Sequence, residues 1–246
     1  SLKHFGEQFD IHGGGHDLRF PHHEAEIFQS ESCTGCEPVV GYWMHNGFVN
    51  VDGEKMSKSL GNFWTVRDAF EHHPPLALRY ALLSVPYRNP IDLTPEFIED
   101  ATTHYGRLVE AYGVSLSADG ESGVDLSGAS ERFTTAMDDD FNTRAAMIEV
   151  QGVVASAAGS DVADWLEQHA GDALGLLPSS DEVMAGLAQA DSARAEVAER
   201  VEALLAEREV ARKSSDWGRA DEIRDELVSI GVIVEDGSDG PTWRLA

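Results

Sequence analysis

Lysine is scarce in this 246-residue sequence. The eighteen basic residues include only four lysines, they face 44 acidic residues, and the formal net charge is −26 with histidine neutral. Such an excess of acidic charge favours solubility and repels nucleic acid at low ionic strength. It is also typical of proteins that work in concentrated salt, where the Debye length shrinks to about 3 Å at 1 M. We therefore hypothesise a halophilic source.

Cysteine is also scarce, and long apolar runs are absent from the sequence. The two cysteines, Cys33 and Cys36, are too few for a disulfide framework and fit a reducing compartment. Their C-x-x-C spacing leaves three interpretations open: half of a zinc site, a redox pair, or a loop with two thiols. No apolar run approaches the roughly 20 residues that span a bilayer, and no signal-peptide pattern opens the chain. These absences predict a cytoplasmic protein without a membrane partner.

The scarcity of lysine draws attention to one stretch that has two. Lys55 and Lys58 lie within Lys55-Met56-Ser57-Lys58-Ser59, so half of all the lysines fall inside five residues. Ammonium groups on flexible stems, together with hydroxyls, suit the charge of a polyphosphate. The alternative is a solvated turn that happens to be basic. In a chain that otherwise avoids lysine, the full string favours a phosphate-binding loop.

Upstream of this loop, the pattern predicts an α/β unit. A short apolar strand from Phe9 to His12 runs into the glycine triplet at 13–15, and a helix is expected over Pro21–Ser30. A glycine turn between a strand and a helix lets the backbone approach a ligand closely. The apolar and aromatic residues of 39–51 predict a buried strand with a turn at Asn46-Gly47.

The expected helix carries a pair of metal-ligating side chains. His22 and Glu26 are four positions apart and share one helix face, whereas His23 and Glu24 are expected to point elsewhere. An imidazole and a carboxylate can converge on one ion, but two ligands do not complete a tetrahedral zinc site. A hydrogen-bonded pair on the helix surface therefore remains the alternative.

Five stretches together carry a family resemblance. They are Asp10-Ile11-His12-Gly13-Gly14-Gly15, Phe20-Pro21-His22-His23-Glu24-Ala25-Glu26, Tyr42-Trp43-Met44-His45, Lys55 through Asn62, and the segment from Arg208 to Arg244. The first four resemble the catalytic domain of class I aminoacyl-tRNA synthetases, closest to the cysteinyl-tRNA synthetases, and the fifth resembles the anticodon-binding end of that family. The resemblance covers nearly all of the chain. Because the first residue is not Met, we interpret the sequence as a piece of a longer protein that lacks the first part of the catalytic domain.

The resemblance implies a metal site. His22 and Glu26 match two of the four ligands of one zinc ion per monomer, which binds the thiolate of the substrate cysteine. The other two family ligands are cysteines that precede the start of this sequence. Cys33 and Cys36 match no family ligand. Zinc prefers a soft thiolate to a hydroxyl, which separates cysteine from serine without an editing domain.

The resemblance also implies a nucleotide site. His12 falls where the family places a histidine against the amino acid, and Gly14 and Asp17 fall on the adenosine-facing turn. Lys58 matches the principal ATP-contacting lysine, with Lys55 as its companion. These lysines are implied to act in catalysis by stabilising charge on the phosphates of ATP, which is bound with Mg²⁺.

The implied activity is that of a cysteine–tRNA ligase, with L-cysteine, ATP and tRNA(Cys) as partners, acting as a monomer in translation. The carboxylate of cysteine attacks the α-phosphate, and the cysteinyl group is then transferred to the tRNA. We expect this piece alone to be inactive. Two alternatives stay open: a ligase that joins cysteine to an amino-sugar acceptor, and a non-catalytic RNA-binding module. An amino-sugar ligase would not need the segment at 208–244, which resembles an anticodon-binding end.

The same resemblance predicts an α/β fold followed by mostly α structure. It comprises the second half of a Rossmann-like nucleotide-binding domain, then a helical bundle, then a small helix-plus-hairpin domain of the anticodon-binding type. The predicted division is 1–66 for the catalytic half, 67–114 for connector helices, 115–180 for a helical tRNA-contacting domain with a linker at 115–130, and 181–246 for the anticodon-binding region.

Three further local features follow from the residues. Thr94 is predicted to cap a helix that begins at Pro95. The acidic string Asp138–Asp140 is interpreted as structural, at the start of a helix, because consecutive side chains diverge. The last helix before the C-terminal helix and hairpin is predicted from about Ala190 to Lys213.

The halophile hypothesis makes a prediction about salt. If the acidic surface is adapted to concentrated salt, the melting temperature rises from low to molar KCl as repulsion between carboxylates is screened. A melting temperature that is unchanged or falls would count against the hypothesis.

Overall fold

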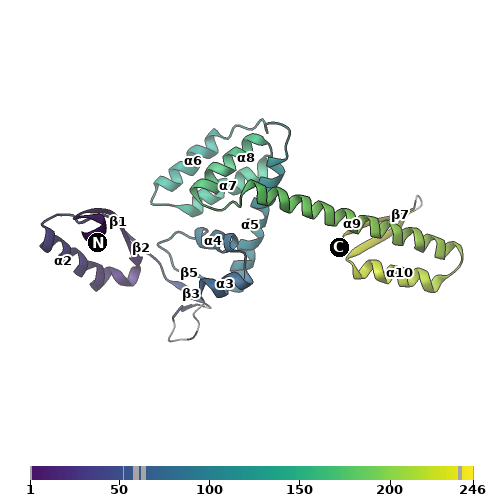
Figure 1. The fold of residues 1–246 in the computed structure, drawn as a ribbon, viewed down its shortest axis with the longest axis horizontal. Coiled ribbons are helices and arrows are strands. Elements are labelled where there is room, and N and C mark those ends of the chain that lie inside the picture. Colours follow the sequence, from purple (N-terminus) through teal and green to yellow (C-terminus); the bar gives the residue numbers. More distant parts are fainter. Residues whose placement is uncertain (1, 52, 58–60, 62–64, 238–239, 246) are drawn as a thin grey trace. The chain divides into compact units, whose positions relative to one another are not determined.

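The chain divides into two compact units, residues 1–180 and 181–246, and most of its regular structure is helical (Figure 1). None of the described helices is both long and apolar enough to cross a membrane. The computed structural model describes residues 2–51, 53–57, 61, 65–237 and 240–245.

The first sheet of unit 1 consists of two parallel strands, β1 (Phe9–Gly15) and β2 (Val40–Asn46), preceded by the short helix α1 (Leu2–Phe5). The register places His12 opposite Trp43 and Gly14 opposite His45. The prediction of a glycine turn was therefore wrong, because the three glycines continue the strand to its end. Without side chains, they allow other groups to approach the strand closely.

The predicted helix also begins later than expected. A 3₁₀ turn, η1 (His16–Leu18), and a π-helical turn, η2 (Arg19–His23), precede the regular helix α2 (Glu24–Thr34). Phe20 interrupts the helical geometry with extended torsion angles (φ −139°, ψ 132°), as expected of a residue before proline. The i to i+5 hydrogen bonds of a π-turn change the angular spacing of its side chains.

The second sheet contains three short strands, β3 (Val49–Val51), β4 (Glu54–Lys55) and β5 (Ile91–Asp92). β3 pairs antiparallel with β4 and parallel with β5. The prediction of one buried strand over 39–51, with a turn at Asn46-Gly47, is corrected: β2 ends at Asn46, β3 begins at Val49, and the two strands belong to different sheets. Instead, the N–H of Gly47 donates to the carbonyl of Tyr87 at 2.8 Å.

The connecting helices are α3 (Val66–His72), α4 (Pro75–Leu83) and α5 (Pro95–Leu116). The prediction that Thr94 caps α5 is confirmed, because its hydroxyl accepts a hydrogen bond from the N–H of Phe97 at 3.2 Å. α4 packs against α5 and buries Tyr80.

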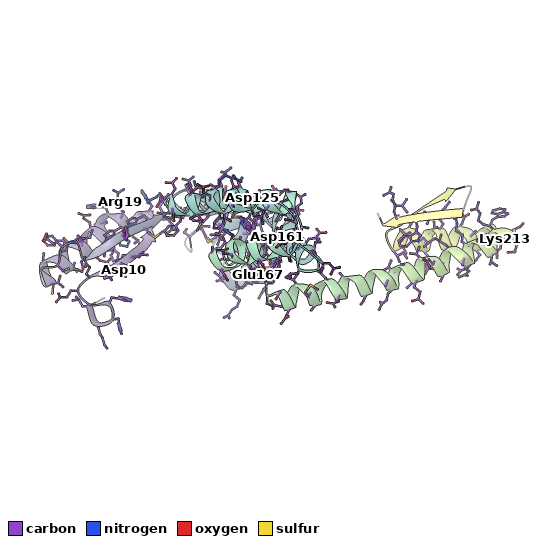
Figure 2. The ribbon with its side chains drawn as sticks, turned by 90° about the horizontal axis from the view of Figure 1, so that it is seen from above. Asp10, Arg19, Asp125, Asp161, Glu167 and Lys213 are labelled. Atoms are coloured by element: carbon purple, nitrogen blue, oxygen red, sulfur yellow. The ribbon has the colours of Figure 1, made fainter. Side chains whose placement is uncertain are left out.

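The helical part of unit 1 contains α6 (Ser127–Asp138), α7 (Thr143–Ser156), α8 (Ser160–Leu166) and the π-helical turn η3 (Glu167–Ala173), with α6 beside α7 and α8 against α5. The predicted linker at 115–130 is shorter than expected, because α5 extends to Leu116 and α6 begins at Ser127. Asp161, labelled in Figure 2, holds this connection by accepting bonds from the N–H and hydroxyl of Ser122, each at 2.6 Å.

The acidic string does not begin a helix as predicted. Asp138 ends α6, Asp139 caps its C-terminus, and Asp140 and Phe141 adopt positive φ angles of 55° and 53°. The amide of Asn142 is the cap of α7, accepting from the N–H of Ala145 at 3.2 Å. The structural interpretation of the string holds, but its place is a tight turn between two helices.

Unit 2 packs a helix and a hairpin on the end of a long helix. Its elements are α9 (Ser180–Lys213), α10 (Trp217–Ser229), β6 (Val232–Gly237) and β7 (Gly240–Leu245). The start of α9 precedes the predicted position near Ala190. The predicted hairpin is confirmed, since β6 and β7 are antiparallel and meet at Gly237 and Gly240. Its core is formed by Val201, Leu204, Leu205, Ile223, Leu227 and Val232.

The close contact at Gly47 yields a stability prediction. A Cβ at this position would lie 2.2 Å from the backbone oxygen of Asn89 and 2.5 Å from the nitrogen of Pro90, so backbone must move. We expect Gly47→Ala to lower the free energy of unfolding by about 1–3 kcal/mol, measured by urea denaturation.

Gly106→Ala on α5 is the matched control, because its added Cβ meets nothing within 4 Å apart from its chain neighbours and the backbone of its own helix. Alanine in place of a helical glycine should raise stability by about 0.5–1 kcal/mol. Equal effects of the two substitutions would contradict the contact at Gly47.

Candidate functional site

The carboxylate of Glu26 is the centre of a cluster at the first sheet. Its two oxygens lie 3.4 Å from the Nε2 atoms of His12, on β1, and of His22, on η2. The spacing of His22 and Glu26 thus brings the pair together as predicted. Glu26 Oε2 is buried and has no hydrogen-bond partner among the described residues. A buried oxygen of this kind calls for an explanation, and a cation between the carboxylate and the imidazoles is one.

His23 was expected to point away from this cluster, and that expectation was wrong. Its side chain is buried, and its Nδ1 lies 2.8 Å from Nε2 of His45 on β2. The ring fits against β1 only because position 14 is glycine: a Cβ on Gly14 would lie 2.7 Å from Cε1 of His23. The π-turn and the missing side chain together turn His23 inward.

The ligand atoms of His12, His23 and Glu26 lie within 4.8 Å of one another, the one such group found among the described residues. Burial lowers the pKa of His23 below its usual value of 6.5, and burial likewise lowers that of His45. Neutral imidazole is the form that binds a metal ion. The site therefore offers two overlapping donor sets that share Glu26, one with His22 and one with His12 and His23.

Trp43 forms an aromatic wall of this site. It stacks on His12 with ring centroids 4.7 Å apart and on His45 with centroids 6.2 Å apart. Sequence reasoning did not assign Trp43, His45 or His23 to the site. The signal available was strand alternation, because residues 43 and 45 share one face of β2.

Lys55 lies beside the turn that follows β1. Its Nζ is 3.1 Å from Oδ2 of Asp17 and 4.0 Å from the centre of the Phe48 ring. The hydrogen bond from Lys55 lowers the pKa of Asp17. Two residues assigned to the nucleotide site from separate segments are thus in contact. Lys58, assigned to the same site, lies outside the described residues.

The two cysteines lie away from the cluster's donor set. Cys33 is exposed on α2 and Cys36 is half-buried, and both are free thiols. Cys36 follows the end of α2, where its N–H donates to the hydroxyl of Thr34 at 3.1 Å. The geometry gives these thiols no part in the donor sets that share Glu26.

A pocket of about 470 Å³ adjoins the cluster. His16, Arg19, His45 and Arg88 contribute nitrogen-bearing side chains to its wall, together with the carboxylate of Glu24. Figure 2 labels Arg19 on the part of the chain that carries β1 and α2. The arrangement as a whole combines a potential cation site with an adjacent pocket lined by two arginines.

Two family models match the chain. The model of the class I (C) tRNA synthetase catalytic domain matches residues 1–103, which contain the cluster, and the model of the cysteinyl-tRNA ligase anticodon-binding domain matches residues 194–244. The two matches therefore fall in different units of the structure.

Curated relatives align with nearly the whole chain. The chain is 44% identical to a cysteine–tRNA ligase of Laribacter hongkongensis, covering 98% of this chain and 53% of that protein. The corresponding enzyme of Chromobacterium violaceum is 44% identical, with 100% and 54% covered, and that of Halorhodospira halophila is 45% identical, with 97% and 52% covered. The chain thus spans about half the length of the curated relatives that it matches.

Among solved structures, Mycobacterium tuberculosis methionyl-tRNA synthetase in complex with methionyl-adenylate aligns with 72% of this chain and 37% of its own chain. The sequence identity is 18% and the TM-score is 0.44.

Proposed function

This chain belongs to the cysteine–tRNA ligase family, and from that premise we propose that the protein containing it activates L-cysteine with ATP and Mg²⁺ and transfers the cysteinyl group to tRNA(Cys). The observation that carries the proposal is the convergence of His12 and His22 on Glu26, inside the segment that matches the catalytic model.

The proposed metal is one zinc ion held by His22 and Glu26. The donor chemistry fits, because zinc accepts imidazole nitrogen and carboxylate oxygen. The buried Oε2 of Glu26 makes no hydrogen bond with the described residues, and a bound cation would satisfy it. When bound, zinc supplies a soft acceptor for the thiolate of cysteine. His12, stacked on Trp43, borders the same space and is proposed to contact the amino acid.

Lys55 and Lys58 are proposed to act in catalysis by binding the phosphates of ATP. Lys55 lies beside Asp17, so its ammonium is held at the turn after β1 that we propose to face adenosine. Gly14, near the end of β1, is proposed to face adenosine as well. A fixed ammonium stabilises the charge that develops on the phosphates as the carboxylate of cysteine attacks, and this role needs no covalent step by the protein.

We assign tRNA recognition by the proposed domain division: the catalytic half at 1–66, connector helices at 67–114, a tRNA-contacting helical domain at 115–180 and the anticodon-binding region at 181–246. In the last, Trp217 is 60% exposed and offers a ring on which an unpaired base can stack, whereas Trp243 packs on the core.

The two alternatives find less support. A ligase for an amino-sugar acceptor has no need of an anticodon-binding domain, yet residues 194–244 match one. A purely RNA-binding module would leave the catalytic match and the cluster around Glu26 without a role.

The zinc proposal predicts the outcome of a substitution at Glu26. We expect Glu26→Gln to weaken zinc binding by this chain about tenfold or more, because the neutral amide replaces an anionic ligand. Zinc retained after dialysis against a competing chelator measures the change.

Glu24→Gln is the control, since it removes the same charge two positions away on α2, outside both donor sets. If the two variants retain equal zinc, Glu26 is not a ligand.

The activity proposal predicts cysteine-dependent exchange of pyrophosphate into ATP by the complete enzyme that contains this chain. Lys55→Ala should lower the rate about 100-fold, as for loss of one donor to developing charge. Lys213→Ala, which removes a lysine paired with Glu209 on α9, is the control and should leave exchange unchanged. Absence of exchange in the wild-type enzyme would refute the proposed function.

A further inference from the structure

Two arginines line the pocket of about 470 Å³ beside the cluster. Arg19 and Arg88 share its wall with the imidazoles of His16, His23 and His45, and Glu24 is the one carboxylate among its described lining residues. The sequence has only eighteen lysines and arginines against 44 acidic residues, so two arginines at one pocket stand out from the average surface. Such a pocket suits an anion with several oxygens, such as a phosphate or pyrophosphate.

Arg88 reaches this pocket from a segment remote from the other three. It lies between α4 and β5, while His16, Arg19 and His45 surround β1 and β2. Two contacts fix its segment. The N–H of Gly47, directly after β2, donates to the carbonyl of Tyr87, and Gly47 packs so closely on Asn89 that no side chain fits.

The second contact is made by Asp140. Arg88 donates to both oxygens of this carboxylate, from Nε to Oδ2 and from Nη2 to Oδ1 at 2.9 Å, and the hydroxyl of Tyr87 donates to Oδ1 at 2.8 Å. A two-pronged pair of this kind orients the guanidinium plane as well as holding its charge. Arg88 lines the pocket while it is held in this pair.

The backbone conformation at Asp140 is one that few residue types tolerate. It has a φ of 55°, in the left-handed region, where aspartate and asparagine are the most tolerated residues after glycine. The hydrogen bonds from Arg88 and then Tyr87 lower the pKa of Asp140 to about 2, so the carboxylate is ionised at neutral pH.

We propose that Asp140 is a positioning residue, which orients Arg88 so that its guanidinium completes a phosphate-binding pocket with His16, Arg19 and His45. Asp140 itself does not touch the anion. The identity of the natural ligand as a phosphate of ATP or of RNA rests on the proposed function, whereas the positioning role rests only on the geometry described above.

Charge and orientation predict opposite effects of a substitution at Asp140 on anion affinity. Removing a negative charge near the pocket should strengthen anion binding if charge alone matters. A positioning role predicts the opposite, because Arg88 loses its orientation. We therefore expect Asp140→Asn to weaken binding of inorganic pyrophosphate by this chain about five- to tenfold, measured by titration calorimetry at fixed ionic strength. Asparagine tolerates the left-handed backbone, so the fold should be kept.

Asp139→Asn is the matched control. It removes the same charge from the adjacent exposed residue and should leave the affinity unchanged or slightly higher. Arg88→Ala should weaken binding at least as much as Asp140→Asn. If Asp140→Asn does not fold, Tyr87→Phe is the substitute test. It removes only the hydroxyl that donates to Asp140, and we expect a smaller loss of affinity.

Unchanged or tighter binding by Asp140→Asn would overturn the positioning role, and undetectable binding by the wild-type chain, or binding unaffected by Arg88→Ala, would overturn the pocket as the phosphate site. The proposed function fails separately, if the complete enzyme shows no cysteine-dependent exchange while pyrophosphate binding still depends on Asp140.

Discussion

The arrangement of the site depends on a close approach between a strand and a turn. Gly14 leaves room on β1 for the ring of His23, which a Cβ would meet at 2.7 Å. With that ring in place, His23 reaches His45, and the start of α2 is held so that Glu26 lies between His12 and His22. A side chain at position 14 would push the turn away from the strand and separate the donors. The glycine therefore acts through packing, not through a turn.

A second theme is the use of carboxylates to hold cations in an acidic chain. Lys55 is held by Asp17, and Arg88 is held by Asp140, which is 52 residues distant in sequence. In a chain with a net charge of −26, a basic side chain on a flexible stem can pair with many different acidic groups. Each of these carboxylates holds one cation in a fixed place, Lys55 at the turn after β1 and Arg88 at the wall of the pocket.

Local features of the structure could be predicted from the sequence because neighbouring residues determine them. The cap at Thr94, the face shared by His22 and Glu26, and the hairpin at Gly237 and Gly240 are of this kind. The inward turn of His23 could not, since it depends on a π-turn and on the strand packed against it. The pairing of Arg88 with Asp140 depends on how distant helices pack, which no local pattern records.

The most direct test of the site at Glu26 is X-ray absorption spectroscopy at the zinc edge, on this chain loaded with zinc. If Glu26 and His22 hold the metal, the atoms bound to it are nitrogen and oxygen alone, at about 2.0–2.2 Å, from imidazole and carboxylate. The only thiols in the sequence are Cys33 and Cys36. Sulfur scatterers at about 2.3 Å would place the metal on those cysteines instead and contradict the assignment of Glu26 and His22.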